Sequence, residues 1–210
     1  MDTVNMSSRK SPDYHHGALR DAIIKRTLEH LKSQSMEAIS LRKIAKDLGV
    51  SHNAPYMHFK DKEALWTAIS VEGFKLLARD IMTATADQPD WRKRLVSGCV
   101  AYVEFSHLQR EYFLVMFRPK SGPQDSTAIA SNLETLSILT DELRRGMEDG
   151  HIRPTDPDTL ASTFWAILHG AAMIRIQSGA PPALFRDSTG TAKLIESLLV
   201  GCEVGRSPES

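Results

Sequence analysis

A short amphipathic segment followed by a glycine turn constrains this chain more than any other stretch of it. Within residues 40–62, Leu41, Ile44 and Leu48 recur at helical spacing and give one apolar face. Gly49 follows the last of these positions, where a residue of left-handed conformation commonly ends a helix. The pattern therefore predicts a short helix that stops at a sharp turn.

The residues after this turn predict a second short helix. Ser51 is a suitable N-cap because its hydroxyl can accept a hydrogen bond from an unpaired backbone N–H, so the helix should run from about residue 52 to 58. Pro55 lies near the end of its first turn, where a missing N–H costs less than in mid-helix. Two short helices joined in this way form a helix-turn-helix, whose second helix enters a DNA major groove. The same shape also occurs in proteins that never bind DNA.

The polar residues of the second helix suit a DNA-reading role. His52 and Asn53 can reach base edges, and an asparagine can pair with both hydrogen-bonding positions of adenine. Phosphate contacts, which position a protein without reading sequence, are expected from Tyr56, His58, Lys60 and Lys62. The predicted surface also includes Arg42, Ser51 and Met57. Upstream, His16 and Gly17 stand either at a phosphate-binding helix N-terminus or at an ordinary helix entry.

This stretch resembles the TetR family of one-component transcriptional regulators. The resemblance covers about residues 14–66, and it is carried by Ile44-Ala45, Gly49-Val50-Ser51, Tyr56, Phe59, Lys62 and Leu65. It implies a helical dimer that represses transcription and leaves its operator when a small ligand binds. It also implies phosphate contacts from Tyr56 and Lys62, and base contacts from His52 and Asn53. Ala54-Pro55 departs from the commoner pair of a small residue and leucine, and Trp165, His169 and Gly170 resemble a C-terminal signature of one subset.

Composition is that of a globular protein without a membrane anchor. The chain is 41% hydrophobic, but it has neither an apolar run of membrane-spanning length nor an N-terminal signal sequence, so we expect a cytoplasmic protein. Its net charge is zero, yet residues 1–66 hold 11 Lys and Arg against 8 Asp and Glu. This small excess agrees in sign with a DNA-facing N-terminus. Cys99 and Cys202 are expected to be reduced packing residues.

The remaining periodicity predicts an all-α protein: a three-helix reader followed by a helical bundle, about nine helices in total. We expect a mobile arm at 1–13, a DNA-binding domain at 14–60, a ligand and dimerisation domain at 61–203 and a mobile tail at 204–210. Within the second domain, one predicted helix over about 125–147 carries the apolar residues Ile129, Leu133, Leu136, Leu139, Leu143 and Met147.

Large apolar and aromatic residues are more numerous in the second domain than one compact region needs. Each could be an ordinary core residue, but together they predict an apolar pocket for a hydrophobic small molecule, with polar groups from His169, Tyr102 and Arg175. The ligand would displace the helix over 61–84. The predicted pocket residues are Trp91, Tyr102, Phe105, Phe113, Met116, Phe117, Trp165, His169 and Met173.

The last helix carries an apolar stripe that would be unfavourable in water, formed by Leu194, Ile195, Leu198 and Leu199. A two-fold dimer through the last two long helices would cover this stripe. It would also place two reading helices about one DNA turn, roughly 34–36 Å, apart or a little more. We therefore expect a homodimer that binds double-stranded operator DNA.

A different function class remains open from the residues alone. Glu104 and His107 have the spacing of a ligand pair in a carboxylate-bridged di-iron bundle, and Glu148 and His151 repeat it. The second pair spans Gly150 near a predicted helix end, so its side chains need not share a face. Two further inward glutamates are not evident, and a regulator without catalysis, metal or cofactor remains the expectation.

Overall fold

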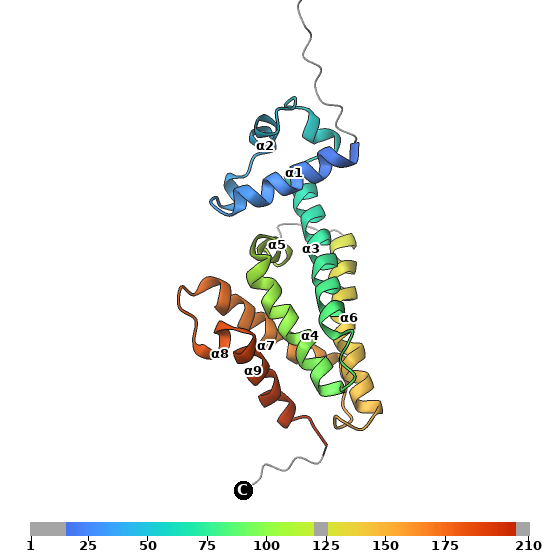
Figure 1. The fold of residues 1–210 in the computed structure, drawn as a ribbon. Helices are drawn as coiled ribbons and strands as arrows, with labels where there is room; N and C mark the ends of the chain where they lie inside the picture. The colour runs from blue at the N-terminus through green and yellow to red at the C-terminus, as the bar shows by residue number, and fades with distance from the viewer. Residues whose placement is uncertain (1–15, 120–125, 205–210) are drawn as a thin grey trace, which may run out of the picture. The chain divides into compact units, whose positions relative to one another are not determined.

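The computed structural model describes residues 16–119 and 126–204. Among these residues there are nine α-helices and two short 3-10 helices, and the only β pairing is an isolated bridge between Ile152 and Glu203. The prediction of an all-α protein is confirmed. In chain order the elements are α1 His16–Leu31, η1 Met36–Ala38, α2 Leu41–Asp47, η2 Ala54–Met57, α3 Lys62–Thr85, α4 Trp91–Leu108, α5 Arg110–Met116, α6 Ser126–Glu148, α7 Pro157–Gln177, α8 Ala183–Arg186 and α9 Ser188–Val200 (Figure 1).

The chain divides into two compact units, Met1–Leu65 and Trp66–Ser210. The division falls inside α3, about one turn after its first residue, whereas the sequence placed the domain boundary between residues 60 and 61. The arm expected at 1–13 and most of the tail expected at 204–210 lie outside the described residues.

In the first unit, α1, α2 and η2 pack around a small apolar core. Ile23, Ile44 and Phe59 are almost completely buried, and the guanidinium of Arg20 lies over the Phe59 ring at 5.7 Å. The turn after α2 has the predicted geometry, because Gly49 has a φ of +68°. The Val50 N–H returns to the Ala45 carbonyl at 3.0 Å, which satisfies a carbonyl that the end of α2 leaves open.

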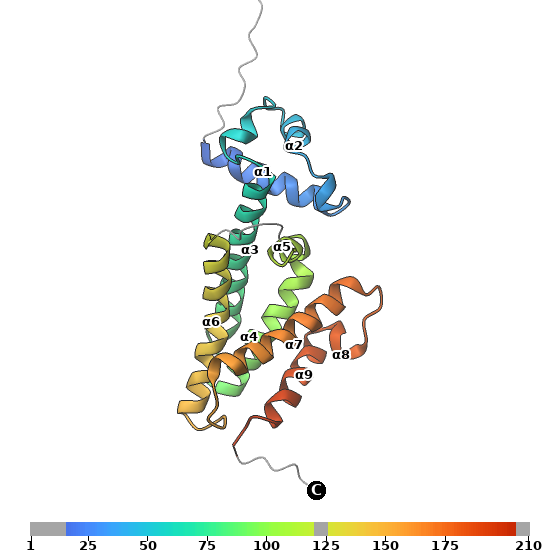
Figure 2. The same ribbon diagram turned by 180° about the vertical axis from the view of Figure 1, so that it is seen from behind.

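In the second unit, α4 is the central helix. It packs against α7, α9 and α6, and both views show α3 and α6 on one side of it and α9 on the other, while α7 crosses it and also packs against α6 (Figures 1 and 2). The core beside α4 contains large side chains from several helices, including Leu95, Phe105, Phe113, Phe164 and Ile195, all nearly inaccessible to water. Burial of this apolar surface is the main stabilising contribution to the unit.

Aspartates begin four of the longer helices. Asp61 accepts from the Ala64 N–H at 2.8 Å at the start of α3. The carboxylates of Asp90, Asp156 and Asp187 accept equivalent bonds from backbone N–H groups at the starts of α4, α7 and α9. Each carboxylate satisfies a backbone N–H that has no partner within its own helix, and its charge suits the positive end of the helix dipole.

In the first half of α6, the large apolar residues do not face the core. Ile129 and Leu133 are 38% and 59% exposed, whereas Ser131 and Thr135 are buried. These hydroxyls can be buried because each donates to the carbonyl four residues earlier, at 3.0 Å and 2.9 Å. Small side chains with satisfied hydroxyls therefore form the contact face, and bulkier apolar residues are left outside.

Helix α7 has more apolar surface than the chain itself buries. It is the one helix in the described ranges that is long and apolar enough to cross a membrane by length and composition, yet only 28% of its most apolar 18-residue window is buried. A helix of this kind leaves apolar surface that another molecule can cover. Its outward side includes Ala166 and Ile174.

Candidate DNA-binding surface and effector cavity

The segment expected to read DNA is a 3-10 helix, not the α-helix predicted from residue 52. Tyr56 N–H bonds to the Asn53 carbonyl at 3.1 Å, and His58 N–H bonds to the Pro55 carbonyl at 3.0 Å. Both are three-residue spacings. Pro55 is the physical reason, because it has no N–H with which to reach the Ser51 carbonyl, and the N–H of Ala54 takes that acceptor instead. Ser51 accordingly does not cap this helix, which begins after Asn53 without a side-chain cap.

Most of the predicted DNA-contacting side chains are exposed around this segment. Tyr56 is 44% and Met57 78% exposed, His58 is half-buried, and Pro55 beneath them is buried. The other exposed positions are Arg42, Ser51, His52, Asn53 and Lys60. Pro55 thus anchors the segment to the core, and its polar neighbours are left on the surface.

Three other predicted DNA contacts have different surroundings. The Lys62 ammonium donates to the Glu37 carbonyl at 2.9 Å, so this lysine already joins the start of α3 to η1. Gly17 is exposed in the first turn of α1, and His16 begins that helix. The side chain of His16 is outside the described part of the structure.

A histidine that the sequence analysis did not select connects α1 to α2. The Nε2 atom of His30 lies 2.6 Å from an Asp47 carboxylate oxygen, and its Nδ1 atom lies 3.3 Å from the Gln34 amide nitrogen. Lys43 donates to the same Gln34 side chain at 3.3 Å. These contacts hold the first helix of the helix-turn-helix in place. In the sequence, Asp47 is one of several outward residues of an amphipathic pattern. Only the three-dimensional structure shows that it contacts α1 through His30.

The second unit contains a cavity of about 220 Å³ between α3, α4, α6 and α7. Its wall is mainly apolar and includes Phe74, Leu77, Ile81, Leu95, Cys99, Tyr102, Phe117, Leu136, Leu139, Trp165 and Leu168. Burial raises the pKa of the Cys99 thiol to about 12, so this group is uncharged at neutral pH. Such a wall suits the apolar body of a small molecule.

Only three of the nine predicted pocket residues line this cavity: Tyr102, Phe117 and Trp165. The others are core or cluster residues, because the bundle uses their side chains to hold helices together. Phe105, Phe113 and Met116 are almost completely buried, and Met173 packs against the same core. The wall residues that the sequence analysis missed come chiefly from α3 and α6.

Trp91 shows why a large aromatic residue need not face a cavity. Its indole N–H donates to the Glu142 carbonyl at 3.0 Å, and its ring stacks on His151 with a centroid separation of 5.2 Å. A Cβ added to Gly146 would lie 2.4 Å from the indole, so the α6 backbone approaches the ring closely. Trp91 therefore joins α4 to α6.

His169 lies in an aromatic cluster next to the cavity. Its Nδ1 atom is 3.0 Å from the Tyr102 hydroxyl, and its ring is 5.4 Å from Trp165 and 4.6 Å from Phe117, centroid to centroid. Desolvation lowers the pKa of His169, and burial raises the pKa of Tyr102. Both groups are therefore neutral near pH 7.

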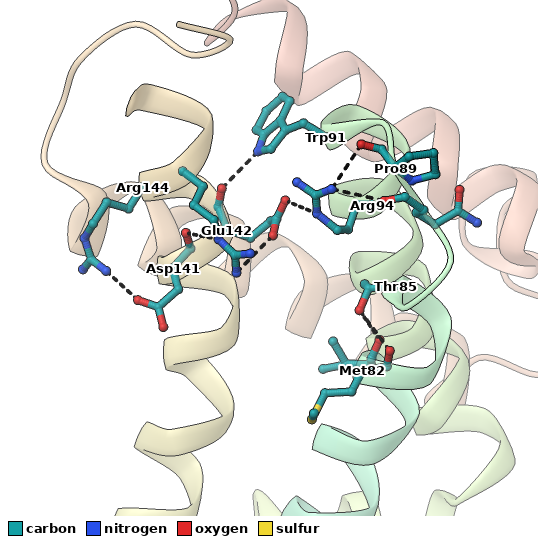
Figure 3. Close-up of polar contacts among 11 residues, drawn as sticks. Met82, Thr85, Pro89, Trp91, Arg94, Asp141, Glu142 and Arg144 are labelled. Atoms are coloured by element: carbon teal, nitrogen blue, oxygen red, sulfur yellow. Dashed lines mark hydrogen bonds and ion pairs between the residues drawn. The ribbon is translucent and has the colours of Figure 1, made fainter. Parts of the chain in front are cut away.

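One end of the cavity is charged. Arg94 donates from Nε to a Glu142 carboxylate oxygen at 2.8 Å, and Arg145 lies 3.3 Å from the other oxygen. Figure 3 shows the Arg94 guanidinium directed toward Glu142, while Arg144 turns away toward Asp141. Arg94, Glu142 and Arg145 all line the cavity. No motif in the sequence singled out this cluster, because arginine and glutamate are common on outward helix faces.

Two matches with known families cover most of the chain. Residues 23–69 match the family described as bacterial regulatory proteins, tetR family, and residues 95–198 match the tetracyclin repressor-like C-terminal domain. The chain belongs to the tetR family. A curated relative, the tetracycline repressor protein class C of Escherichia coli, is 34% identical over 83 residues, which are 40% of this chain. The matched stretch spans 37% of that repressor's length.

Solved structures agree with this tetR-family fold. A protein of unknown function from Rhodococcus sp. RHA1 is 27% identical, with a TM-score of 0.80 over 92% of this chain and 100% of that one. PfmR, a TetR family transcriptional regulator from Thermus thermophilus, gives 0.68 at 23% identity over 88% and 99%. AibR in complex with isovaleryl coenzyme A and operator DNA gives 0.66 at 17% identity over 87% and 96%. The last two show the fold alone.

The di-iron alternative is not supported for this tetR-family chain. Both oxygens of Glu104 bond to Arg175, at 2.6 Å and 3.0 Å, and His107 is exposed. His151 stacks on Trp91, and no group of three or more potential ligands gathers among the described residues. The same pairing corrects the prediction that Arg175 would orient a ligand, because its guanidinium is already held by Glu104.

The stripe predicted for dimerisation is divided between two environments. Ile195 and Leu199 are completely buried in the core of their own protomer, so they have no surface to offer a second chain. Leu194 and Leu198 are partly buried. The division arises because α9 packs on α4 with one side of its stripe, so Ile195 and Leu199 face inward on successive turns while Leu194 and Leu198 lie at the edge of this contact.

Proposed function

We propose that this tetR-family protein is a sequence-specific DNA-binding transcriptional regulator, a repressor that leaves its operator when a small apolar effector enters the cavity. The observation that carries the proposal is the pairing of an exposed polar helix-turn-helix surface with a mainly apolar cavity in the other unit. AibR, whose fold is similar, was solved with both isovaleryl coenzyme A and operator DNA. The proposed role requires no cofactor or catalysis, and it places the protein in the cytoplasm with the DNA.

Different residues of the DNA-binding surface have different proposed roles. His52 and Asn53 contact base edges, and Tyr56 and Lys60 contact phosphates. Asn53→Ala should cost roughly 1–3 kcal/mol at the cognate site and relax the preference at one base pair. Lys60→Ala should weaken binding to all sequences alike and reduce the salt slope by about one unit. Lys60 is the better phosphate variant, since Lys62 also bonds to the Glu37 carbonyl.

The test begins with selection of a binding sequence from random DNA duplexes, followed by anisotropy titrations at several salt concentrations. Lys93→Ala is the matched control, because Lys93 is an exposed lysine on α4, outside the proposed DNA-binding and dimer surfaces. If Asn53→Ala and Lys60→Ala bind the selected duplex as wild type does, the proposed DNA-binding surface is wrong.

The functional protein is proposed to be a homodimer formed through the outward faces of α7 and α9. The poorly buried apolar surface of α7 and the partly buried Leu194 and Leu198 support this assembly. Ala166→Glu should place a charge in the interface and give a monomer in light scattering at micromolar concentration. Leu133→Glu is the control, because Leu133 is exposed on α6. A wild-type monomer would contradict the proposal.

The effector is proposed to act on α3, which forms part of the cavity wall and continues without a break from the first unit. The molecule must bind the DNA-incompetent state more tightly, because equal affinity for both states shifts neither. Leu136→Trp should fill the cavity and abolish the response to ligand while operator binding persists. Leu133→Trp, on the exposed side of the same helix, should respond as wild type does. An unchanged ligand response in folded Leu136→Trp would place the effector site elsewhere.

A further inference from the structure

We infer that the effector is a compact apolar monoanion whose carboxylate binds Arg94 and Arg145 and whose body lies against the aromatic wall. This inference rests on the proposed function, because it takes the cavity to be the effector site. It adds the charge and the size class of the molecule.

The charge balance of the wall favours an anion. Its charged residues are Arg94, Arg145 and Glu142, which together carry one excess positive charge. The adjacent pair of Asp141 and Arg144 is neutral as a pair and does not belong to the wall. A ligand with one negative charge would neutralise this excess positive charge, whereas a cation would be placed near two guanidinium groups and only one carboxylate.

The hydrogen-bond donors at the charged end of the cavity also favour an anionic ligand. A guanidinium has five N–H donors. Arg94 uses Nε on Glu142 and one terminal nitrogen on the Gln88 and Pro89 carbonyls, and its second terminal nitrogen has no protein partner among the described residues. Arg145 likewise uses Nε on the Asp141 carbonyl and one terminal nitrogen on Glu142. Each arginine therefore keeps a terminal N–H₂ group available for an acceptor.

Three neutral polar residues of the wall, Thr85, Thr135 and Tyr102, are already bonded within the protein. Thr135 donates to the Ser131 carbonyl and Thr85 to the carbonyls of Ile81 and Met82, the latter pair drawn in Figure 3. The Tyr102 hydroxyl is paired with His169. Asn132 also lines the wall and can offer a neutral amide, but Arg94 and Arg145 are the charged donors that a head group meets there. Charge-assisted bonds of this kind are stronger than neutral ones.

The size of the cavity limits the body of the ligand. A volume of about 220 Å³ lies below the range of roughly 300–1,000 Å³ that is usual for drug-sized ligands. Tyr102, Phe117 and Trp165 supply flat aromatic surface in the wall. A short carboxylic acid with an aromatic or branched body matches both the volume and the surface.

The test uses three probes of similar shape: phenylacetate, phenylacetamide and phenethylammonium. Their affinities for the full-length protein are measured by isothermal titration calorimetry at neutral pH, without DNA. We expect phenylacetate to bind most tightly. Arg145→Gln should weaken phenylacetate roughly ten-fold, as loss of a charge-assisted hydrogen bond predicts, and leave phenylacetamide unchanged. Arg145 is 57% exposed, so this variant should fold.

Arg144→Gln is the matched control, since Arg144 is an exposed neighbouring arginine that bonds to Asp141. It should bind phenylacetate as wild type does. The inference is overturned if phenylacetate binds no more tightly than the amide or the ammonium, if none of the three binds, or if Arg144→Gln and Arg145→Gln weaken it equally. These titrations need no DNA, so they fail independently of the selection experiment that tests the regulatory function.

Discussion

The two sides of α4 use buried charge in different ways. Toward α7, Glu104 and Arg175 form two hydrogen bonds with each other, and the Arg175 side chain is only 8% exposed. Toward α6, one Glu142 carboxylate is shared between Arg94 and Arg145, beside the cavity. The α7 side is a one-to-one pair without net charge, whereas the α6 side has two guanidinium groups for one carboxylate.

This difference separates a structural contact from a recognition site. A neutral one-to-one pair has no excess charge to attract an ionic ligand, and its contribution is to hold two helices in register. A cluster with unused donors next to an apolar cavity can exchange or add an acceptor without leaving a buried charge unpaired. Both clusters contain ordinary residues on helical surfaces, so only their surroundings in three dimensions distinguish them.

The largest expected effect on stability comes from breaking the pair formed by Glu104 and Arg175. Glu104→Ala should lower the free energy of unfolding by about 2–3 kcal/mol, because Arg175 would remain buried without its partner. The value is placed below that of a fully buried pair because Glu104 is 26% exposed. Chemical denaturation provides the measurement, and phenylacetate affinity should not change in the folded protein.

The double variant Glu104→Leu with Arg175→Met is the control for this prediction. It replaces the ion pair by apolar side chains of similar length and should recover most of the lost stability, since a buried pair is often no better than well-packed hydrophobic residues. A double variant as unstable as Glu104→Ala would show that the pair contributes through something other than mutual neutralisation.

A smaller effect on stability is expected at the shared carboxylate. Glu142→Gln should cost about 1 kcal/mol, because Arg94 keeps its bonds to two backbone carbonyls and the exposed Arg145 can be hydrated. The loss of the competing negative charge should also raise phenylacetate affinity a few-fold. Asp141→Asn, at the neighbouring exposed carboxylate, should do neither. Weaker phenylacetate binding by Glu142→Gln would mean that Glu142 itself contacts the probe.

The sequence was more informative about the first unit than about the second. In the first, the Gly49 turn depends on local backbone rules, and the structure has it as predicted. Even there, the predicted reading α-helix was wrong, because the missing N–H of Pro55 gives a 3-10 helix. The proline was visible in the sequence, and its hydrogen-bond consequence could have been derived.

In the second unit, periodicity located the helices but did not show which side chains line the cavity. Trp91 and Phe113 are large aromatic residues of the kind that often line pockets, yet they pack between helices. Thr135 and Glu142 look like solvent-facing residues, yet both are buried and line the wall. Such assignments depend on how neighbouring helices are rotated, and a single helix's pattern does not contain that information.

The smallest expected effect is a dependence of stability on pH at the α7 side, centred on His169. Desolvation lowers its pKa in the folded protein below the ordinary value of 6.5. Between the two pKa values the unfolded chain binds more protons than the folded one, so stability rises with pH there. The contribution of neutral His169 is therefore complete above about pH 6.5 and is lost as pH falls toward the folded pKa.

His169→Asn tests this dependence, because an asparagine oxygen can still accept from the Tyr102 hydroxyl but does not titrate in this range. The stability difference between wild type and this variant, measured by denaturation from pH 7.5 to 5, should shrink or reverse as the pH falls below roughly 6.5. His107→Asn is the control, since His107 is exposed on α4, and its difference from wild type should stay nearly constant. A wild-type advantage over His169→Asn that grows in acid would show that the protonated imidazole is stabilised in the cluster, and the α7 side would then hold a second charged site.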